Sequence, residues 1–292
     1  MSFHRYGRSF RVGSQIMSRD GSPLSDDLLM QAAPSVFATE AHESRSARFA
    51  PVATIDVLNG LRREGFEPFS AMQARTRDES RKDFTKHLVR LRHRGISNDA
   101  GQSFEIVLVN ANDGTAAYQM LPGFFRMVCA NGLIAGETFE GVKVRHSGNA
   151  IGDVIEGAYR VLEDAPKIAA QVDAFRSLSL NRDEQQVFAE AAHVLRFPDH
   201  YAQEAADRRE TAITADQLLR PRRHDDRAAD LWTTFNVTQE NVIRGGLTAW
   251  GRDANNNRRR QTTREVQGID QNRNLNRALW TLAERMAELK AA

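Results

Sequence analysis

The sequence predicts an α+β fold in which an antiparallel meander sheet is covered by a long kinked helix and followed by a helical C-terminal region. Between residues 66 and 125 apolar and polar side chains alternate with the period of two that is typical of strands, and no helical pattern interrupts them. From residue 149 the period changes to that of an amphipathic helix. Helix-capping patterns then recur along the rest of the chain.

The N-terminal part predicts little regular structure before two short helices. Residues 1–24 are rich in Ser, Gly and Arg without periodicity, so we expect an arm. Ser25 is placed to cap a short helix that Pro34 ends. A second helix is expected to begin near Thr54 and to end at Gly65.

The central part predicts four strands, with turn residues between them. Asn112-Asp113-Gly114 is the clearest hairpin turn, because these residues tolerate the left-handed conformation. Consecutive strands without intervening helices favour an antiparallel meander. The four strands are residues 66–77, 84–94, 104–110 and 116–125, and residues 142–146 are a candidate fifth.

The remaining residues predict helices. Asn149 is placed to cap the long helix, whose apolar face continues to Phe175, and Pro166 is expected to kink it. Residues 252–260 read as a polar connecting segment before a final helix. These patterns predict three regions: an arm with a short helix (1–33), a core of sheet and helix (34–178) and a helical region (179–292).

Composition narrows the class of protein. The 292 residues are 41% hydrophobic and 27% charged, which is typical of a globular protein. The 40 Lys and Arg are balanced by 38 Asp and Glu, so only a local arrangement of charges could favour a polyanion. One cysteine excludes an intramolecular disulfide, and no apolar run is long enough to span a bilayer. We therefore expect a cytoplasmic protein without a membrane partner.

No pattern typical of catalysis is present. The sequence has no Walker A, Gly-x-Gly-x-x-Gly or Gly-x-Ser-x-Gly motif, and its eight histidines lack metal-ligand spacing. Cys129 lies in an apolar run, where a small buried side chain is the ordinary interpretation. We expect no cofactor and no metal, although an active site assembled from distant residues remains open.

A run of basic residues is the most informative functional signal. Lys86, Arg90, Arg92 and Arg94 would share one face of a strand, and their spacing of about 6.6 Å is close to the phosphate spacing of an extended single strand. Arg75 and Arg77 could extend this face from the preceding strand. The alternative is an ordinary solvated sheet face with acidic partners on neighbouring strands.

Two further basic clusters lie later in the chain. Residues 220–224 are followed at once by Asp225 and Asp226, which weakens a polyanion role. Arg258, Arg259 and Arg260 have no acidic residue between 254 and 263, so they predict either a mobile phosphate-contacting loop or a solvated linker.

Several segments resemble the bacterial "phage/plasmid-like protein" family, a domain of unknown function. Residues 126–132 resemble its Arg-x-Val-Cys-x-Asn-Gly signature, and further similar stretches are residues 219–226, 231–236, 239–246 and 274–280. The resemblance covers roughly residues 34–289 and implies a gene carried by plasmids and prophages, where DNA replication, recombination and defence are common tasks. The order of a sheet and then a long helix also resembles single-strand annealing proteins of the Red-beta type, by analogy alone.

These observations favour a non-catalytic nucleic-acid-binding protein that acts on single-stranded DNA in recombination or replication. Its contacts would be Arg75, Arg77, Lys86, Arg90, Arg92, Arg94 and Arg258 to Arg260. The alternatives are a metal-dependent nuclease with a dispersed active site and a protein-assembly factor, and the sequence is compatible with a homo-oligomer.

Overall fold

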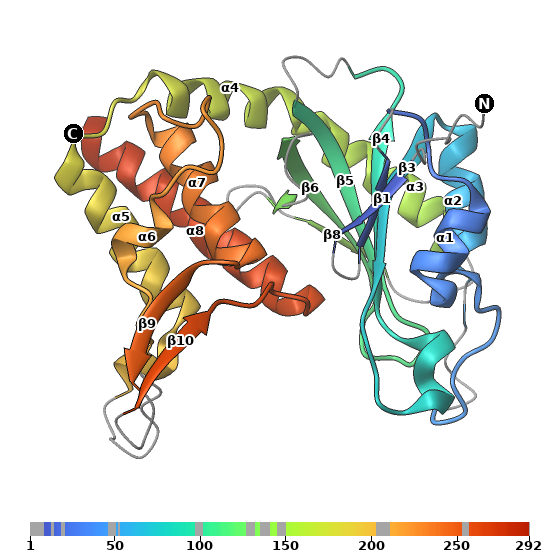
Figure 1. Ribbon diagram of the computed structural model, residues 1–292. Coiled ribbons are helices and arrows are strands. Elements are labelled where there is room, and N and C mark those ends of the chain that lie inside the picture. The colour runs from blue at the N-terminus through green and yellow to red at the C-terminus, as the bar shows by residue number, and fades with distance from the viewer. Residues whose placement is uncertain are drawn as a thin grey trace, which may run out of the picture. The chain divides into compact units, whose positions relative to one another are not determined.

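A computed structural model describes residues 9–12, 15–18, 21–45, 51, 53–96, 102–126, 132–134, 141–144, 150–202, 211–252 and 257–291. The chain divides into two compact units, residues 1–165 with 267–269 and residues 166–266 with 270–292 (Figure 1). The helix of residues 165–177 therefore belongs to the second unit, whereas the sequence placed it with the sheet.

The first unit contains the predicted antiparallel meander. Strands β1 to β7 follow one another across the sheet, every described pair is antiparallel, and β8 pairs with β6. The strands are β1 (Ser9–Val12), β2 (Gln15–Ser18), β3 (Phe66–Gln73), β4 (His87–His93), β5 (Gln102–Asn110), β6 (Tyr118–Arg126), β7 (Gly132–Ile134) and β8 (Val142–Val144). The four strands expected from the period of two are confirmed with shifted ends, and the turn before β6 has Gly114 at φ +76°.

The N-terminal residues differ from the expected arm. Ile16 and Met17 of β2 are buried, and β2 pairs with β3 from Gln15↔Met72 to Met17↔Ser70. The hydroxyl of Ser70 also donates a hydrogen bond to the Ile16 carbonyl at 2.9 Å. Pairing with a distant strand therefore orders residues that have little strand pattern of their own.

Three helices lie on one side of the sheet: α1 (Asp26–Ala32), α2 (Thr54–Arg63) and α3 (Ala150–Glu163) (Figure 1). Ser25 caps α1 as predicted, accepting from the Leu28 amide at 3.4 Å. Short 3-10 turns, Pro34–Phe37 and Glu79–Phe84, lie in the connections.

The long helix is interrupted where its sequence predicts a kink. It stops at Glu163 and resumes as α4 (Ala165–Ser177), in which Pro166 is the second residue. Proline has no amide hydrogen to continue the helical ladder, and it disfavours helical geometry in the residue before it.

The second unit is built from helices α4, α5 (Arg182–Arg196), α6 (Ala215–Leu218), α7 (Leu231–Arg244) and α8 (Ile269–Ala291), with a 3-10 turn at Pro198–Tyr201. Phe175, Phe188, Phe235 and Trp280 are fully buried and come from four different helices. The predicted helical region also contains a hairpin, β9 (Thr248–Arg252) and β10 (Arg258–Thr262) (Figure 1). Residue 252 and residues 258–260 of the expected connecting segment are thus strand residues.

Candidate nucleic-acid interface

The arginines of β4 do not form the open stripe that the sequence suggested. The register confirms that Leu88, Arg90 and Arg92 share a face, but Arg90 is only 3% exposed. Glu105 of β5, fully buried, accepts from Arg90 Nε at 2.5 Å and from Arg92 Nε at 2.8 Å. The guanidinium of Arg92 also lies 4.3 Å from the ring centroid of Phe69. A neighbouring strand therefore covers both arginines.

The electrostatics of Glu105 fit a structural ion pair. Burial alone would raise the pKa of Glu105, but the charges of Arg90 and Arg92 and their hydrogen bonds outweigh burial and hold the pKa below its usual value. The carboxylate is thus kept ionised inside the protein, where it accepts hydrogen bonds from both arginines and its single negative charge offsets one of their two positive charges.

The other basic residues of this region are scattered. Arg94 is exposed but pairs with Glu67 at 2.5 Å, and Lys86 is half-buried. Arg75 and Arg77 are exposed and lie after the end of β3, so they do not continue a strand face as expected. These four basic side chains thus do not form the regular row that the sequence suggested.

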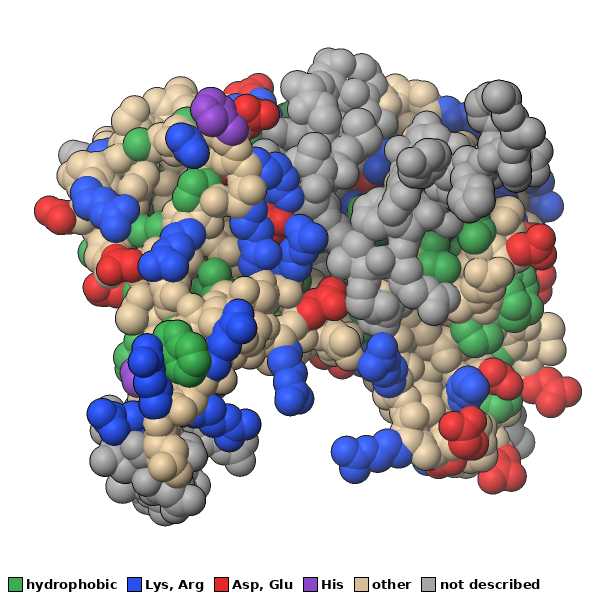
Figure 2. Space-filling model, viewed as in Figure 1, with side chains coloured by type: hydrophobic (Ala, Val, Ile, Leu, Met, Phe, Trp, Pro, Cys, Tyr) green, Lys and Arg blue, Asp and Glu red, His purple; other side chains and the backbone are tan. Residues whose placement is uncertain are grey.

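The β9–β10 hairpin instead gathers basic side chains on one face. Residues directly opposite each other point to the same side of an antiparallel pair, and Arg252 is opposite Arg258 while Trp250 is opposite Arg260. These four residues share a face, which we call the ribbon face. All four are exposed, and Figure 2 shows basic side chains gathered over the hairpin around an exposed apolar one.

The opposite face of the hairpin packs on its own unit. The Ala212 amide donates to Gln261 Oε1 at 2.8 Å, and a Cβ added at Gly251 would lie 2.9 Å from the Cβ of Ala212. Gln217 Nε2 also donates to the Thr248 carbonyl at 3.0 Å. These contacts fix which face points outward. Arg259 is on the packed side by register, although its side chain is exposed.

The remaining basic cluster is structural. Arg223 donates two hydrogen bonds to the buried carboxylate of Glu240, at 2.6 and 2.7 Å, and one to Asp226 at 3.0 Å. Arg222 Nε donates to Asn241 Oδ1 at 2.9 Å and its guanidinium also binds the Gly245 carbonyl. This network joins the loop before α7 to the buried polar residues of that helix, and Asp226 pairs with Arg223 as the adjacent acidic residues suggested.

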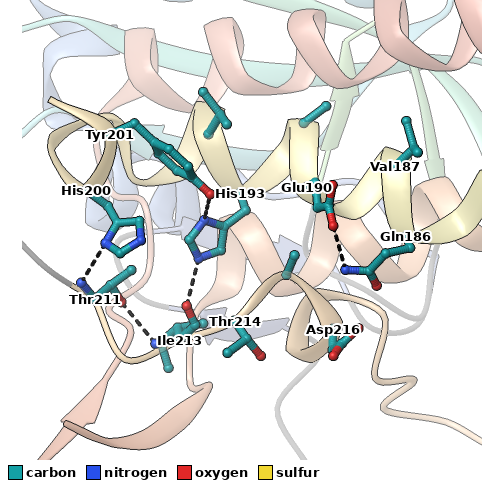
Figure 3. Close-up of a pocket in the computed structure, with 13 residues that line it drawn as sticks. Gln186, Val187, Glu190, His193, His200, Tyr201, Thr211, Ile213, Thr214 and Asp216 are labelled. Carbon is teal, nitrogen blue, oxygen red and sulfur yellow. Dashed lines mark hydrogen bonds between the residues drawn. The ribbon is translucent and has the colours of Figure 1, made fainter. Parts of the chain in front are cut away.

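A pocket of about 710 Å³ lies between α5 and residues 211–216 (Figure 3). His193 is 3% exposed, with Nε2 2.7 Å from the Ile213 carbonyl and Nδ1 2.9 Å from the Tyr201 hydroxyl. Nε2 must carry the proton for the carbonyl, so Nδ1 accepts from Tyr201. Burial lowers the pKa of His193, which favours this neutral form. The imidazole is therefore fully engaged in holding the pocket wall.

Within the described part of the chain, no three His, Cys, Asp or Glu side chains are grouped to hold a metal ion. Among those residues, no helix combines the length and apolar character required to cross a membrane. Cys129 and Asn131 of the signature segment lie outside the described residues.

Comparison with known proteins identifies the family. The UPF0380 proteins YafZ and YfjQ of Escherichia coli K12 are each 45% identical to the chain over 274 residues, which cover 94% of this chain and 95% of each relative. No solved structure shows significant similarity. Residues 41–280 match the model of DUF932, a domain of unknown function. The chain therefore belongs to the DUF932 family.

Proposed function

We propose that this chain is a non-catalytic nucleic-acid-binding protein that holds the phosphates of single-stranded DNA on the ribbon face. The observation that carries the proposal is the presence of three exposed arginines, Arg252, Arg258 and Arg260, on one outward face of a hairpin whose other face is packed.

Two of these arginines lie side by side on the ribbon face. Arg252 and Arg258 are directly opposite each other, so both positive charges lie at the same point of the hairpin. The planar guanidinium binds phosphate oxygens in a bidentate manner, so this pair is suited to a phosphate group. A net charge of only +2 leaves binding dependent on such local clusters.

The contacts proposed from sequence are revised accordingly. Arg258 and Arg260 are kept, joined by Arg252, and Arg259 is placed at the edge of the site. Arg90 and Arg92 are left out because Glu105 covers them. The exposed Arg75, Arg77 and Arg94, with Lys86, form a second candidate set on the first unit.

The test is the salt dependence of binding to a fluorescently labelled oligothymidylate. Each phosphate contact on a single strand contributes about 0.7 to the slope of log K against log salt, so the variant R252A/R258A/R260A should flatten the slope by about 2. Its affinity at low salt should fall, because three ionic contacts are lost.

A control variant carries the same change of net charge. Arg160, Arg176 and Arg285 are exposed and each pairs with a carboxylate of its own helix. The variant R160A/R176A/R285A should keep the slope of the unmodified protein. Equal slopes in the ribbon variant and the unmodified protein, or equal losses in both variants, would refute the ribbon face as the phosphate site.

A protein-assembly role is the second candidate, and one observation favours it. Val187, Val194 and Leu195 of α5 are between 40% and 56% exposed, and Val187 and Val194 also line the pocket. Light scattering with and without DNA distinguishes the two functions. The assembly role would be favoured by an oligomer that dissociates in the V187E/V194E variant and whose size does not change when DNA is added.

A further inference from the structure

We infer that Trp250 is a base-stacking residue, so that the ribbon face takes a strand with unpaired bases: the indole holds one base while Arg252 and Arg260 hold neighbouring phosphates. This inference rests on the proposed function and adds to it the residue that selects unpaired bases.

The exposure of Trp250 sets it apart from the other tryptophans. Trp280 is fully buried and donates a hydrogen bond to Glu284 at 2.8 Å, and Trp232 is 5% exposed. Trp250 is 59% exposed, at the centre of the ribbon face. Removing the apolar surface of an indole from water is favourable in free energy, so a ligand that covers Trp250 would gain that free energy on binding.

Arg258 holds the indole in place. Its Cζ atom lies 4.5 Å from the ring centroid, which is a cation–π contact. The two residues are on adjacent strands and diagonal in the register, so the guanidinium stacks across the ribbon. A nucleobase on the indole would extend this stack. The positive charge of Arg258 would then lie beside the phosphates of the DNA strand.

The chemistry of stacking selects the substrate class. In a duplex the faces of internal bases are covered by their neighbours, and an indole can reach only a base that is unpaired or at an end. Single-strand-binding proteins combine a basic groove with aromatic platforms of this kind. Insertion of the ribbon into the major groove of a duplex is the competing arrangement, and it needs no stacking.

Intrinsic fluorescence of the full chain provides the test. Because the other two tryptophans are buried, a base stacked on Trp250 should quench the exposed part of the emission. We would titrate three polyanions of equal length: oligothymidylate, a duplex, and an abasic sugar–phosphate strand. Oligothymidylate should bind and quench, whereas the abasic strand should bind more weakly without quenching.

Substitutions then separate stacking from charge. W250A should weaken oligothymidylate binding by about 5- to 150-fold, the range for loss of one stacked base, with the salt slope unchanged because no charge is removed. W250F should recover much of the affinity, while W250L, which is apolar but has no π-face, should not. Binding of the abasic strand should be the same in all four proteins.

Each adverse result points to a different failure. If oligothymidylate binds with the full salt slope but W250A binds equally well, or if the duplex binds more tightly than the single strand, the stacking inference is overturned and phosphate binding stands. If none of the three polyanions binds, the proposed function itself is overturned.

Discussion

At the scale of single residues, one buried carboxylate pairs with two arginines of the most basic run in the sequence. Glu105 lies in β5, and only the register of β4 with β5 brings it to Arg90 and Arg92. Arg90 is buried and Arg92 also packs on the ring of Phe69, so neither guanidinium belongs to an open basic face. We therefore expect these arginines to matter for stability.

Replacing Glu105 with Gln should destabilise the protein by about 3–5 kcal/mol, because it leaves two covered guanidiniums without their carboxylate. R94A is the matched control: the Arg94 side chain is 71% exposed, and its pair with Glu67 should contribute about 1 kcal/mol or less. Urea unfolding followed by circular dichroism measures both. A nearly neutral E105Q would show that the buried pair is not structural.

His87 makes the second prediction at this scale. It is fully buried, with Nδ1 2.8 Å from the Ser35 hydroxyl and Nε2 2.9 Å from the Thr54 hydroxyl. Burial lowers its pKa from 6.5 to about 4. The native protein thus binds fewer protons than the unfolded chain between these two values, and stability falls as the pH falls.

The contribution of His87 to the free energy of unfolding is fully present above about pH 6.5 and is lost towards pH 4. The loss is up to about 1.4 kcal/mol per pH unit, or about 3 kcal/mol in all. The measurement is the free energy of unfolding against pH for the unmodified protein and for H87N. The difference between the two curves should change over this window. Parallel curves would show that His87 titrates normally in the folded state.

At the scale of elements, local signals predicted the helix ends well and the hairpin poorly. The capping box of α5 is confirmed: the Glu184 amide donates to Asn181 Oδ1 at 2.9 Å, and the Asn181 amide donates to Glu184 Oε2 at 2.7 Å. The run of Asn and Arg before residue 261 resembles a linker because strand pairing and packing on Ala212 are not local properties.

The end of α7 allows a sharp prediction. Gly245 has φ +67° and ψ −152°, a region that only glycine adopts readily, and an added Cβ would lie 2.6 Å from the carbonyl carbon of Arg264. G245A should cost about 3 kcal/mol through strain and displacement of the chain that leads out of β10.

Gly246 provides the comparison. It also has a positive φ, of +82°, but its added Cβ would meet nothing closer than 3.7 Å. G246A should therefore cost only about 1 kcal/mol. Thermal unfolding of both variants measures the difference, and equal losses would contradict the close approach of Arg264 to Gly245.

At the scale of the whole molecule, the three tryptophans report where surface and core lie. Trp232, Trp250 and Trp280 all belong to the second unit, and only Trp250 is exposed. Acrylamide should therefore quench one component of the native emission and leave the rest protected.

W250F should remove the quenchable component and leave the free energy of unfolding within about 0.5 kcal/mol of the original, as is usual for an exposed position. Strong quenching that persists in W250F would place another tryptophan at the surface. In urea all the remaining emission should become quenchable, which confirms that the protection comes from the fold.

The sequence by itself determined the antiparallel meander, the kink before Pro166, the caps of α1 and α5 and the membership of the family. These features depend on side-chain periodicity, on proline geometry and on residues three positions apart, all of which are local. Only the tertiary structure decided which arginines face water. Glu105 is 13 to 15 residues from the arginines that it covers, and Ala212 is 39 residues from the hairpin face that it packs on. Strand register and packing set these distances in space, and spacing along the chain does not encode them.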